Sequence, residues 1–66
     1  MRKKPKVGQV WYCSFNDAYF LITGVLDKNR EPEYHVCKIK WTDTLERDEV
    51  AVKTLLTHES FSYITG

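Results

Sequence analysis

Glycine is too scarce in this sequence to form a phosphate-binding loop. The 66 residues include only three glycines, Gly8, Gly24 and Gly66, and none of them belongs to a glycine-rich motif. Long apolar runs are absent as well, since none approaches the roughly 18 residues that cross a membrane. No apolar segment follows the basic stretch MRKKPK, as it would in a secretion signal. We therefore expect a cytoplasmic chain with no membrane partner.

Cysteine is limited to Cys13 and Cys37, and both lie among aromatic and β-branched residues typical of strands. In a reducing compartment such cysteines behave as small buried hydrophobes, so we expect two free thiols. His35 and His58 would have to complete a zinc site, but the sequence has no CxxC or HxxxH spacing. We therefore expect no metal and no cofactor.

The sequence also lacks a catalytic constellation. His35 and Cys37 can share a strand face, but an i, i+2 spacing keeps their side chains roughly 7 Å apart, beyond hydrogen-bond reach. Four acids cluster near a predicted hairpin tip, where no cleft would shift their pKa values. These acids are Asp43, Glu46, Asp48 and Glu49. We expect a protein that is not an enzyme.

Positive charge is concentrated at the N-terminus. Residues 1–6 contain no acid and four basic side chains, which are Arg2, Lys3, Lys4 and Lys6. Residues 7–66 contain 6 basic and 9 acidic side chains, a net charge of −3. We expect a flexible basic arm over residues 1–6, followed by a single domain over residues 7–66. Such an arm is either a solubilising terminus or a contact for nucleic-acid phosphates.

Aromatic and β-branched residues, by contrast, are plentiful, and aromatics alone make up 14% of the chain. Hydrophobic residues alternate with a period of two, which predicts strands over residues 9–15, 19–26, 33–41, 47–52 and 61–65. Asn16 and Asp17 predict a tight turn, and Gly24 predicts a bulge or bend within its strand. Five strands in so short a chain form an antiparallel meander that must bury one face. We therefore expect an all-β fold, a small five-stranded antiparallel barrel.

Residues 45–56 leave two interpretations open. Leu45, Glu49, Val52 and Leu56 partly satisfy helical spacing, whereas Val50 and Val52 alternate as in a strand. Threonines crowd this region, and their β-branched side chains favour the strand. After the strand, residues 54–58 are too few for a regular helix and predict one short 3₁₀ turn.

The order of these features resembles an SH3-like β-barrel. The resemblance rests on the opening Val7-Gly8-x-x-Trp11, three hairpin-linked strands, a short turn and a terminal strand. The stretches VGQVWYCSF and YFLITGV also resemble the first two strands of the PemK-like growth-inhibitor barrels, which are ribonuclease toxins. This chain lacks their Arg-Pro step at the second strand. The resemblance therefore implies the fold and none of the toxin's catalytic residues.

Strand alternation also predicts which side chains face outward. The third strand places Ile39 and Trp41 in the core, so the opposite face exposes Tyr34 beside Lys38 and Lys40. Trp11 and Tyr12 point to opposite faces of the first strand, and a small barrel cannot bury all of its aromatic residues. We expect an exposed aromatic patch that marks a partner's site. The candidate partner-binding residues are Tyr34, Lys38, Lys40, Trp11 and Tyr12.

Two functions of different classes fit these features. The first is a non-enzymatic protein-interaction module, such as an accessory protein of a bacterium or phage that modulates a partner protein. The alternative is a nucleic-acid-binding barrel that uses the Tyr/Lys face and the arm residues Arg2, Lys3, Lys4 and Lys6. The net negative charge of residues 7–66 favours the first function. Exposed strand edges also predict some self-association.

Overall fold

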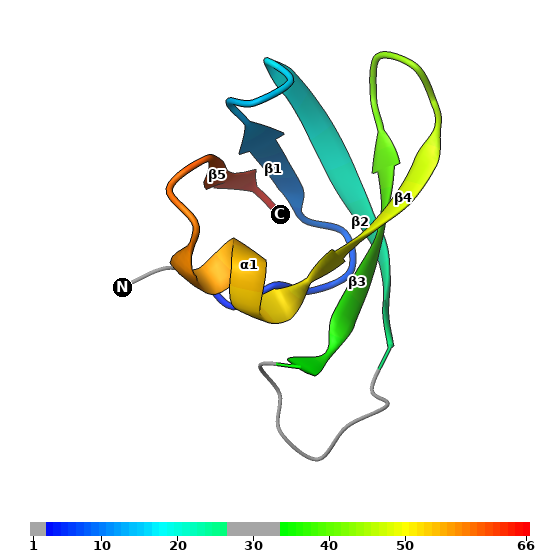
Figure 1. The fold of residues 1–66 in the computed structure, drawn as a ribbon. Coiled ribbons are helices and arrows are strands. Elements are labelled where there is room, and N and C mark those ends of the chain that lie inside the picture. Colours follow the sequence, from blue (N-terminus) through cyan, green and yellow to red (C-terminus); the bar gives the residue numbers. More distant parts are fainter. Residues whose placement is uncertain (1–2, 27–33) are drawn as a thin grey trace.

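The computed structural model describes residues 3–26 and 34–66, so Arg2 and residue 33, the expected start of the third strand, lie outside the described residues. The elements follow the order β1 (Val10–Cys13), β2 (Ala18–Leu26), β3 (Val36–Trp41), β4 (Arg47–Ala51), α1 (Val52–Thr57) and β5 (Phe61–Thr65). The strands form one antiparallel sheet with the order β4-β3-β2-β1-β5 (Figure 1). The predicted all-β class and its five strands are confirmed.

The sheet is curled but not closed, which corrects the expectation of a complete barrel. β4 and β5 are the two edges of the sheet, because β5 pairs with β1 and not with β4. α1 links these edges in the chain and packs against both of them (Figure 1). Its side chains Val52 and Leu55 are buried in the core. The helix therefore covers the side on which a fifth pairing, between β4 and β5, would have closed the sheet.

The helix α1 also corrects the predicted 3₁₀ turn over residues 54–58. It is an α-helix that begins at Val52 and ends at Thr57. Val52 and Leu55 lie one turn apart and are both buried, so tertiary packing stabilises the helix despite its β-branched residues. The strand interpretation of the preceding segment is confirmed, since β4 covers Arg47–Ala51.

The core lies between the inner face of the sheet and α1. The largest fully buried side chains come from β1, β2, β3 and α1, and they are Trp11, Phe20, Ile22, Ile39, Leu55 and Cys37. The predicted core position of Ile39 is confirmed, and Trp41 packs against this core as a partly buried residue. Cys13 is buried as well, and both cysteines are free thiols, as predicted.

Gly24 lies at a bulge in β2, as the sequence predicted. The register between β2 and β3 shifts between Ile22 and Gly24. Before the shift Ile22 faces the core, and after it Val25 packs against the core instead. Bulges bend a strand and increase its twist. This bulge therefore allows the long strand β2 to contribute to both halves of the curled sheet.

Gln9 ties the N-terminal segment to the core. Its side chain is only 2% exposed. Its Oε1 accepts hydrogen bonds from the indole Nε1 of Trp11 and from the backbone N–H of Lys6, both at 3.0 Å. Its Nε2 donates to the backbone carbonyl of Lys4, also at 3.0 Å. Pro5, between these two lysines, is buried. A single amide thus connects the backbone of Lys4 and Lys6 to the start of β1.

Candidate binding surface on the outer face of the sheet

The two faces of the sheet have different surroundings. The inner face packs on α1, and we call the opposite one the outer face. Strand alternation and the observed register place a group of side chains from β1 to β4 on it. The group consists of Val10, Tyr12, Tyr19, Leu21, Lys38, Lys40, Arg47 and Glu49. No helix of the described residues covers this face (Figure 1).

The position of Trp11 corrects its assignment to a binding surface. Trp11 is 0% exposed, because it is on the inner face of β1 and its ring packs edge-on against Tyr63 at 5.9 Å. Its neighbour Tyr12 points outward and is half-buried. The sequence left open which of these two aromatics would be exposed. The structure assigns Tyr12 to the surface and Trp11 to the core.

Tyr12 and Tyr19 form an aromatic pair at one end of the outer face. They are directly opposite each other on β1 and β2, with ring centroids 5.1 Å apart. The Tyr12 hydroxyl donates a hydrogen bond to Oδ1 of Asp17 in the connecting turn. This hydrogen bond, together with smaller effects of burial and the Asp17 charge, raises the pKa of Tyr12 above its ordinary value. The two rings thus form an aromatic pair at the surface, in which the Tyr19 side chain is 47% exposed.

The next row of the outer face changes from apolar to basic side chains. Val10 is opposite Leu21, Leu21 is opposite Lys40, and Lys40 is opposite Arg47. The row therefore crosses four strands, with aliphatic groups on β1 and β2 and cations on β3 and β4. Val10, Leu21 and Lys40 are half-buried, and Arg47 is exposed.

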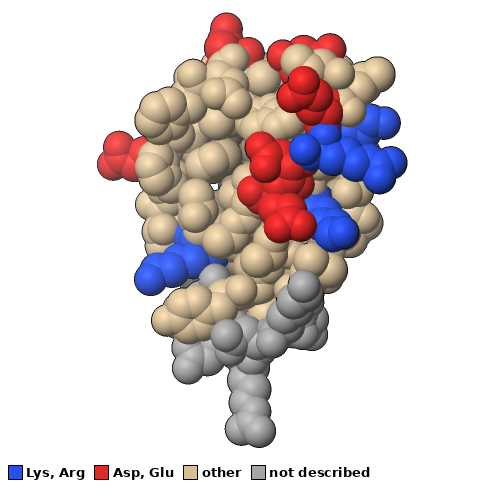
Figure 2. All heavy atoms as spheres, turned by 45° about the vertical axis from the view of Figure 1, so that its right-hand side comes forward, with Lys and Arg blue, Asp and Glu red and all other residues tan. Residues whose placement is uncertain are grey.

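Lys40 and Arg47 are an unfavourable pair in the free protein. Residues directly opposite in an antiparallel sheet have Cβ atoms about 5 Å apart, and like charges at this separation destabilise the sheet. The neighbouring row differs, because Lys38 is opposite Glu49, which is a pair of opposite charges. Figure 2 shows basic side chains gathered beside a column of acidic ones on the surface.

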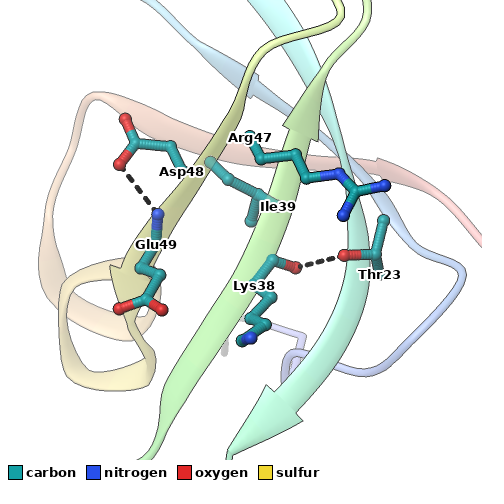
Figure 3. Close-up of a pocket in the computed structure, with 6 residues that line it drawn as sticks. All are labelled: Thr23, Lys38, Ile39, Arg47, Asp48 and Glu49. Carbon is teal, nitrogen blue, oxygen red and sulfur yellow. Dashed lines mark hydrogen bonds between the residues drawn. The ribbon is translucent and has the colours of Figure 1, made fainter.

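A shallow hollow of about 210 Å³ lies over β2, β3 and β4. Its lining residues are Thr23, Lys38, Ile39, Arg47, Asp48 and Glu49. In Figure 3 the Arg47 side chain extends from β4 across β3 toward Thr23, whereas Asp48 points away from the guanidinium. The Thr23 hydroxyl donates to the backbone carbonyl of Lys38 at 3.2 Å. The hollow thus combines a long cation with a hydroxyl that can still accept a hydrogen bond.

Tyr34 stands apart from the other predicted surface residues. It is 52% exposed, but it precedes β3, which begins at Val36. The sequence pattern predicted the Tyr34 ring beside Lys38 and Lys40. Because Tyr34 is outside the strand, alternation does not place it there. Lys38 and Lys40 themselves do lie on the outer face, as predicted.

The described lysines of the arm lie away from this surface, and Lys3 lies beside β5. The Lys3 Nζ is 5.4 Å from the centroid of the Tyr63 ring, a cation–π contact. Tyr63 belongs to the inner face, since it pairs with Trp11. Lys4 and Lys6 are exposed. The described lysines of the arm and the lysines of β3 thus do not form one basic surface. The flexibility of the arm stays a prediction.

A second hollow, of about 350 Å³, lies at the end of the sheet near the β1–β2 and β3–β4 turns. Its lining includes the acids Asp43, Glu46 and Asp48 together with Trp41. Within the described segments, no group of three or more His, Cys, Asp or Glu side chains is arranged to hold a metal ion. We assign no ligand to this hollow.

Sequence reasoning missed several of the residues that form the outer face. Tyr19, Leu21 and Arg47 were not among the predicted site residues. The signal for the first two was present, since Tyr19 and Leu21 alternate with Phe20 and Ile22, which face the core. Predicting Arg47 as a site residue would have required the register between β3 and β4, because only that register places it opposite Lys40.

Comparisons with known proteins do not assign the chain to a family. None of the protein-family models matches the sequence, and the searches of curated proteins and of solved structures find no similar protein. In the described residues, no helix has the length and apolar character that a membrane span requires.

Proposed function

We propose that this chain is a non-enzymatic protein-interaction module that binds its partner through the outer face of the sheet. The observation that carries this proposal is the composition of that face. Tyr12, Tyr19 and Leu21 lie in contiguous rows with Lys40 and Arg47. Tyrosine and arginine are enriched at protein interfaces, and residues of this kind supply most of the binding energy.

The strand arrangement also supports the finer fold proposal, an opened SH3-like barrel. The supporting features are the pairing of β5 with β1, the meander from β1 to β4 and the short helix before the last strand. In this proposal the outer face is available to a partner because the hydrophobic core needs only the inner face and α1. The cytoplasmic location stays a prediction.

The alternative function is binding of single-stranded nucleic acid. The specific observation in its favour is that Tyr12 and Tyr19 are close to the cations of β3 and β4, because exposed rings stack on bases and cations contact phosphates. Glu49 lies on the same face, opposite Lys38, and would repel a phosphate backbone. We therefore rank this function second.

The test of the proposed function is a capture experiment with a matched pair of variants. The immobilised chain is exposed to a nuclease-treated cell lysate, and the retained proteins are compared with those retained by Leu21→Arg and Leu45→Arg. Leu21 is on the outer face, whereas Leu45 is 64% exposed in the β3–β4 turn. We expect the wild type and Leu45→Arg to retain the same protein and Leu21→Arg to lose at least about tenfold of it, since a buried charge at an interface core is costly.

Two results would overturn this proposal. One is retention of the same protein by Leu21→Arg at the wild-type level, which would place the interface elsewhere. The other is loss of all retained material on nuclease treatment, which would favour the nucleic-acid alternative. The urea midpoint of Leu21→Arg shows whether the variant is folded at the temperature of the experiment.

A further inference from the structure

We propose that the partner of the outer face presents an acidic segment, with its carboxylates bound between Lys40 and Arg47 and an apolar side chain on Leu21. This inference rests on the proposed function and names the chemistry of the partner. Its starting point is the like-charge pair. Lys40 and Arg47 are directly opposite each other on β3 and β4, so the free protein holds two cations at about 5 Å separation between Cβ atoms. A carboxylate bound between them would remove this repulsion.

Arg47 has the geometry of a carboxylate receptor. Its side chain extends across β3, over the hollow that Lys38 and Thr23 also line (Figure 3). A guanidinium presents a planar fork of donors that matches a carboxylate in a bidentate hydrogen bond. The hydroxyl of Thr23 already donates to the Lys38 carbonyl. The remaining side-chain donors that line the hollow are those of Lys38 and Arg47, and both are cationic.

The apolar half of the same row sets the spacing that the partner must match. Strands in a sheet are about 4.8 Å apart, so the midpoint of Val10 and Leu21 is about 10 Å from the midpoint of Lys40 and Arg47. An extended chain covers this distance in about three residues. The fitting segment thus carries a hydrophobic residue about three positions from an acidic one, and it crosses the strands of the sheet.

The acidic side chains next to this site favour a peptide over a nucleic acid. Glu49 lies on the outer face, and Asp48 and Glu49 line the hollow beside Arg47. Figure 2 shows acidic groups directly next to the basic ones on this part of the surface. A nucleic acid carries a phosphate at every nucleotide and would bring several of them against these carboxylates. A peptide can place its acids on the two cations alone.

The test uses two defined probes at equal ionic strength. One is the synthetic peptide Gly-Ser-Leu-Gly-Ser-Glu-Glu-Gly-Ser, whose leucine is three positions from an acid, and the other is an oligothymidylate of the same charge. Binding is followed by two-dimensional amide NMR of the full chain. We expect the acidic peptide to shift the amides of Leu21, Lys40 and Arg47 and to bind at least as tightly as the oligothymidylate. In the double variant Lys40→Glu/Arg47→Glu we expect affinity for the acidic peptide to fall at least tenfold, and binding of the same peptide with lysines in place of its glutamates to appear. The control Lys53→Glu changes an exposed cation on α1 and should stay within twofold of the wild type.

The outcomes separate this inference from the proposed function. Tighter binding of the oligothymidylate, or an unchanged affinity of the double variant for the acidic peptide, would overturn the acidic partner. If the lysate protein that depends on Leu21 is still retained by the double variant, the interaction module stands and the acidic segment does not. If no protein depends on Leu21, the proposed function itself fails. The urea midpoint of the double variant shows whether it is folded at the temperature of the experiment.

Discussion

A buried polar side chain, that of Gln9, connects the N-terminal segment of this small domain to its core. Gln9 is almost fully buried and has a hydrogen-bond partner for both atoms of its amide. An apolar residue at this position would leave the Trp11 indole N–H without an acceptor in the core. Because a buried donor without an acceptor costs about 1–3 kcal/mol, the amide contributes to stability even though it is polar.

We therefore expect Gln9→Met to lower the free energy of unfolding by about 2 kcal/mol. Methionine preserves the length of the side chain but removes the acceptor for Trp11 and the donor to the Lys4 carbonyl. The measurement is urea denaturation followed by circular dichroism. The control is Thr57→Ala, which removes an exposed hydrogen bond to the Lys53 carbonyl and should cost less than about 1 kcal/mol. Equal losses in the two variants would contradict the role assigned to Gln9.

A second prediction at the residue scale concerns Cys37 and alkaline pH. Burial raises the pKa of the Cys37 thiol from 9.0 to about 11. Between these two values the unfolded chain releases the thiol proton while the folded chain retains it. The unfolded state then binds fewer protons, so the stability contributed by Cys37 falls as the pH rises through this range.

The measurement is the urea midpoint of the wild type and of Cys37→Ala from about pH 7 to about pH 11. We expect the wild type to be more stable at neutral pH, where alanine leaves a small cavity, and the difference to shrink above about pH 9. A difference that is constant across this range would show that the thiol titrates alike in both states. Because other groups titrate in both proteins, only the difference between them reports on Cys37.

At the scale of elements, alternation was the most informative part of the sequence. Strand β5 was predicted with its observed bounds, and Ile39 was placed correctly because it alternates with two lysines. Gly24 was recognised as a bulge because glycine interrupts an otherwise β-forming run. These features depend on local sequence only, which explains why one sequence was enough to predict them.

Other elements depend on tertiary contacts and were predicted less well. The third strand begins at Val36, so Tyr34 is outside it although the alternating pattern included this residue. The helix α1 forms because Val52 and Leu55 are buried by strands that are distant in sequence. The burial of Trp11 in place of Tyr12 follows from the same packing. The candidate site required the register of four strands, and no local pattern encodes that Lys40 is opposite Arg47.

The β3–β4 turn contains a residue whose conformation is unfavourable for its type. Leu45 has a φ of 63°, in the left-handed region that costs most residues about 1–2 kcal/mol. Its side chain is 64% exposed, so little packing would be lost on substitution. We expect Leu45→Asn to raise the free energy of unfolding by about 0.5 kcal/mol, since asparagine tolerates this conformation. Thermal or urea denaturation of this variant and of Leu45→Ala would test it, because alanine retains the strain and should give no gain.

At the scale of the whole molecule, charge is divided among separate regions. The arm residues Lys3, Lys4 and Lys6 precede β1, the cations of β3 and β4 lie on the outer face, and acids line the hollow near the turns. The arm contacts Tyr63 through Lys3 and the core through its backbone. The backbone of Lys4 and Lys6 therefore has a structural role, whereas the charges of the exposed side chains are available to bind a ligand.

The two candidate functions make opposite predictions for these charges. We consider a variant in which Arg2, Lys3, Lys4 and Lys6 are all replaced by serine. The backbone groups that bond to Gln9 remain, so the fold should be preserved, with a loss of about 0.5 kcal/mol from the Lys3–Tyr63 contact. Deleting the residues instead would remove the Lys4 carbonyl and mix a folding effect with a charge effect.

If the chain acts through the outer face on a protein partner, this variant should change the partner affinity by less than about 1 kcal/mol, as expected for charges outside the interface core. If the arm contacts single-stranded nucleic acid, affinity should drop, and the slope of log affinity against log salt should flatten by about 0.7 for each lost phosphate contact. Titrations of the captured partner and of oligothymidylate at several salt concentrations measure both quantities. We expect the first result, because the arm lies beside Tyr63 on the inner side of β5, whereas the aromatic and basic rows lie on the opposite face of the sheet. A large, salt-dependent loss of oligothymidylate binding would instead assign the function to the arm.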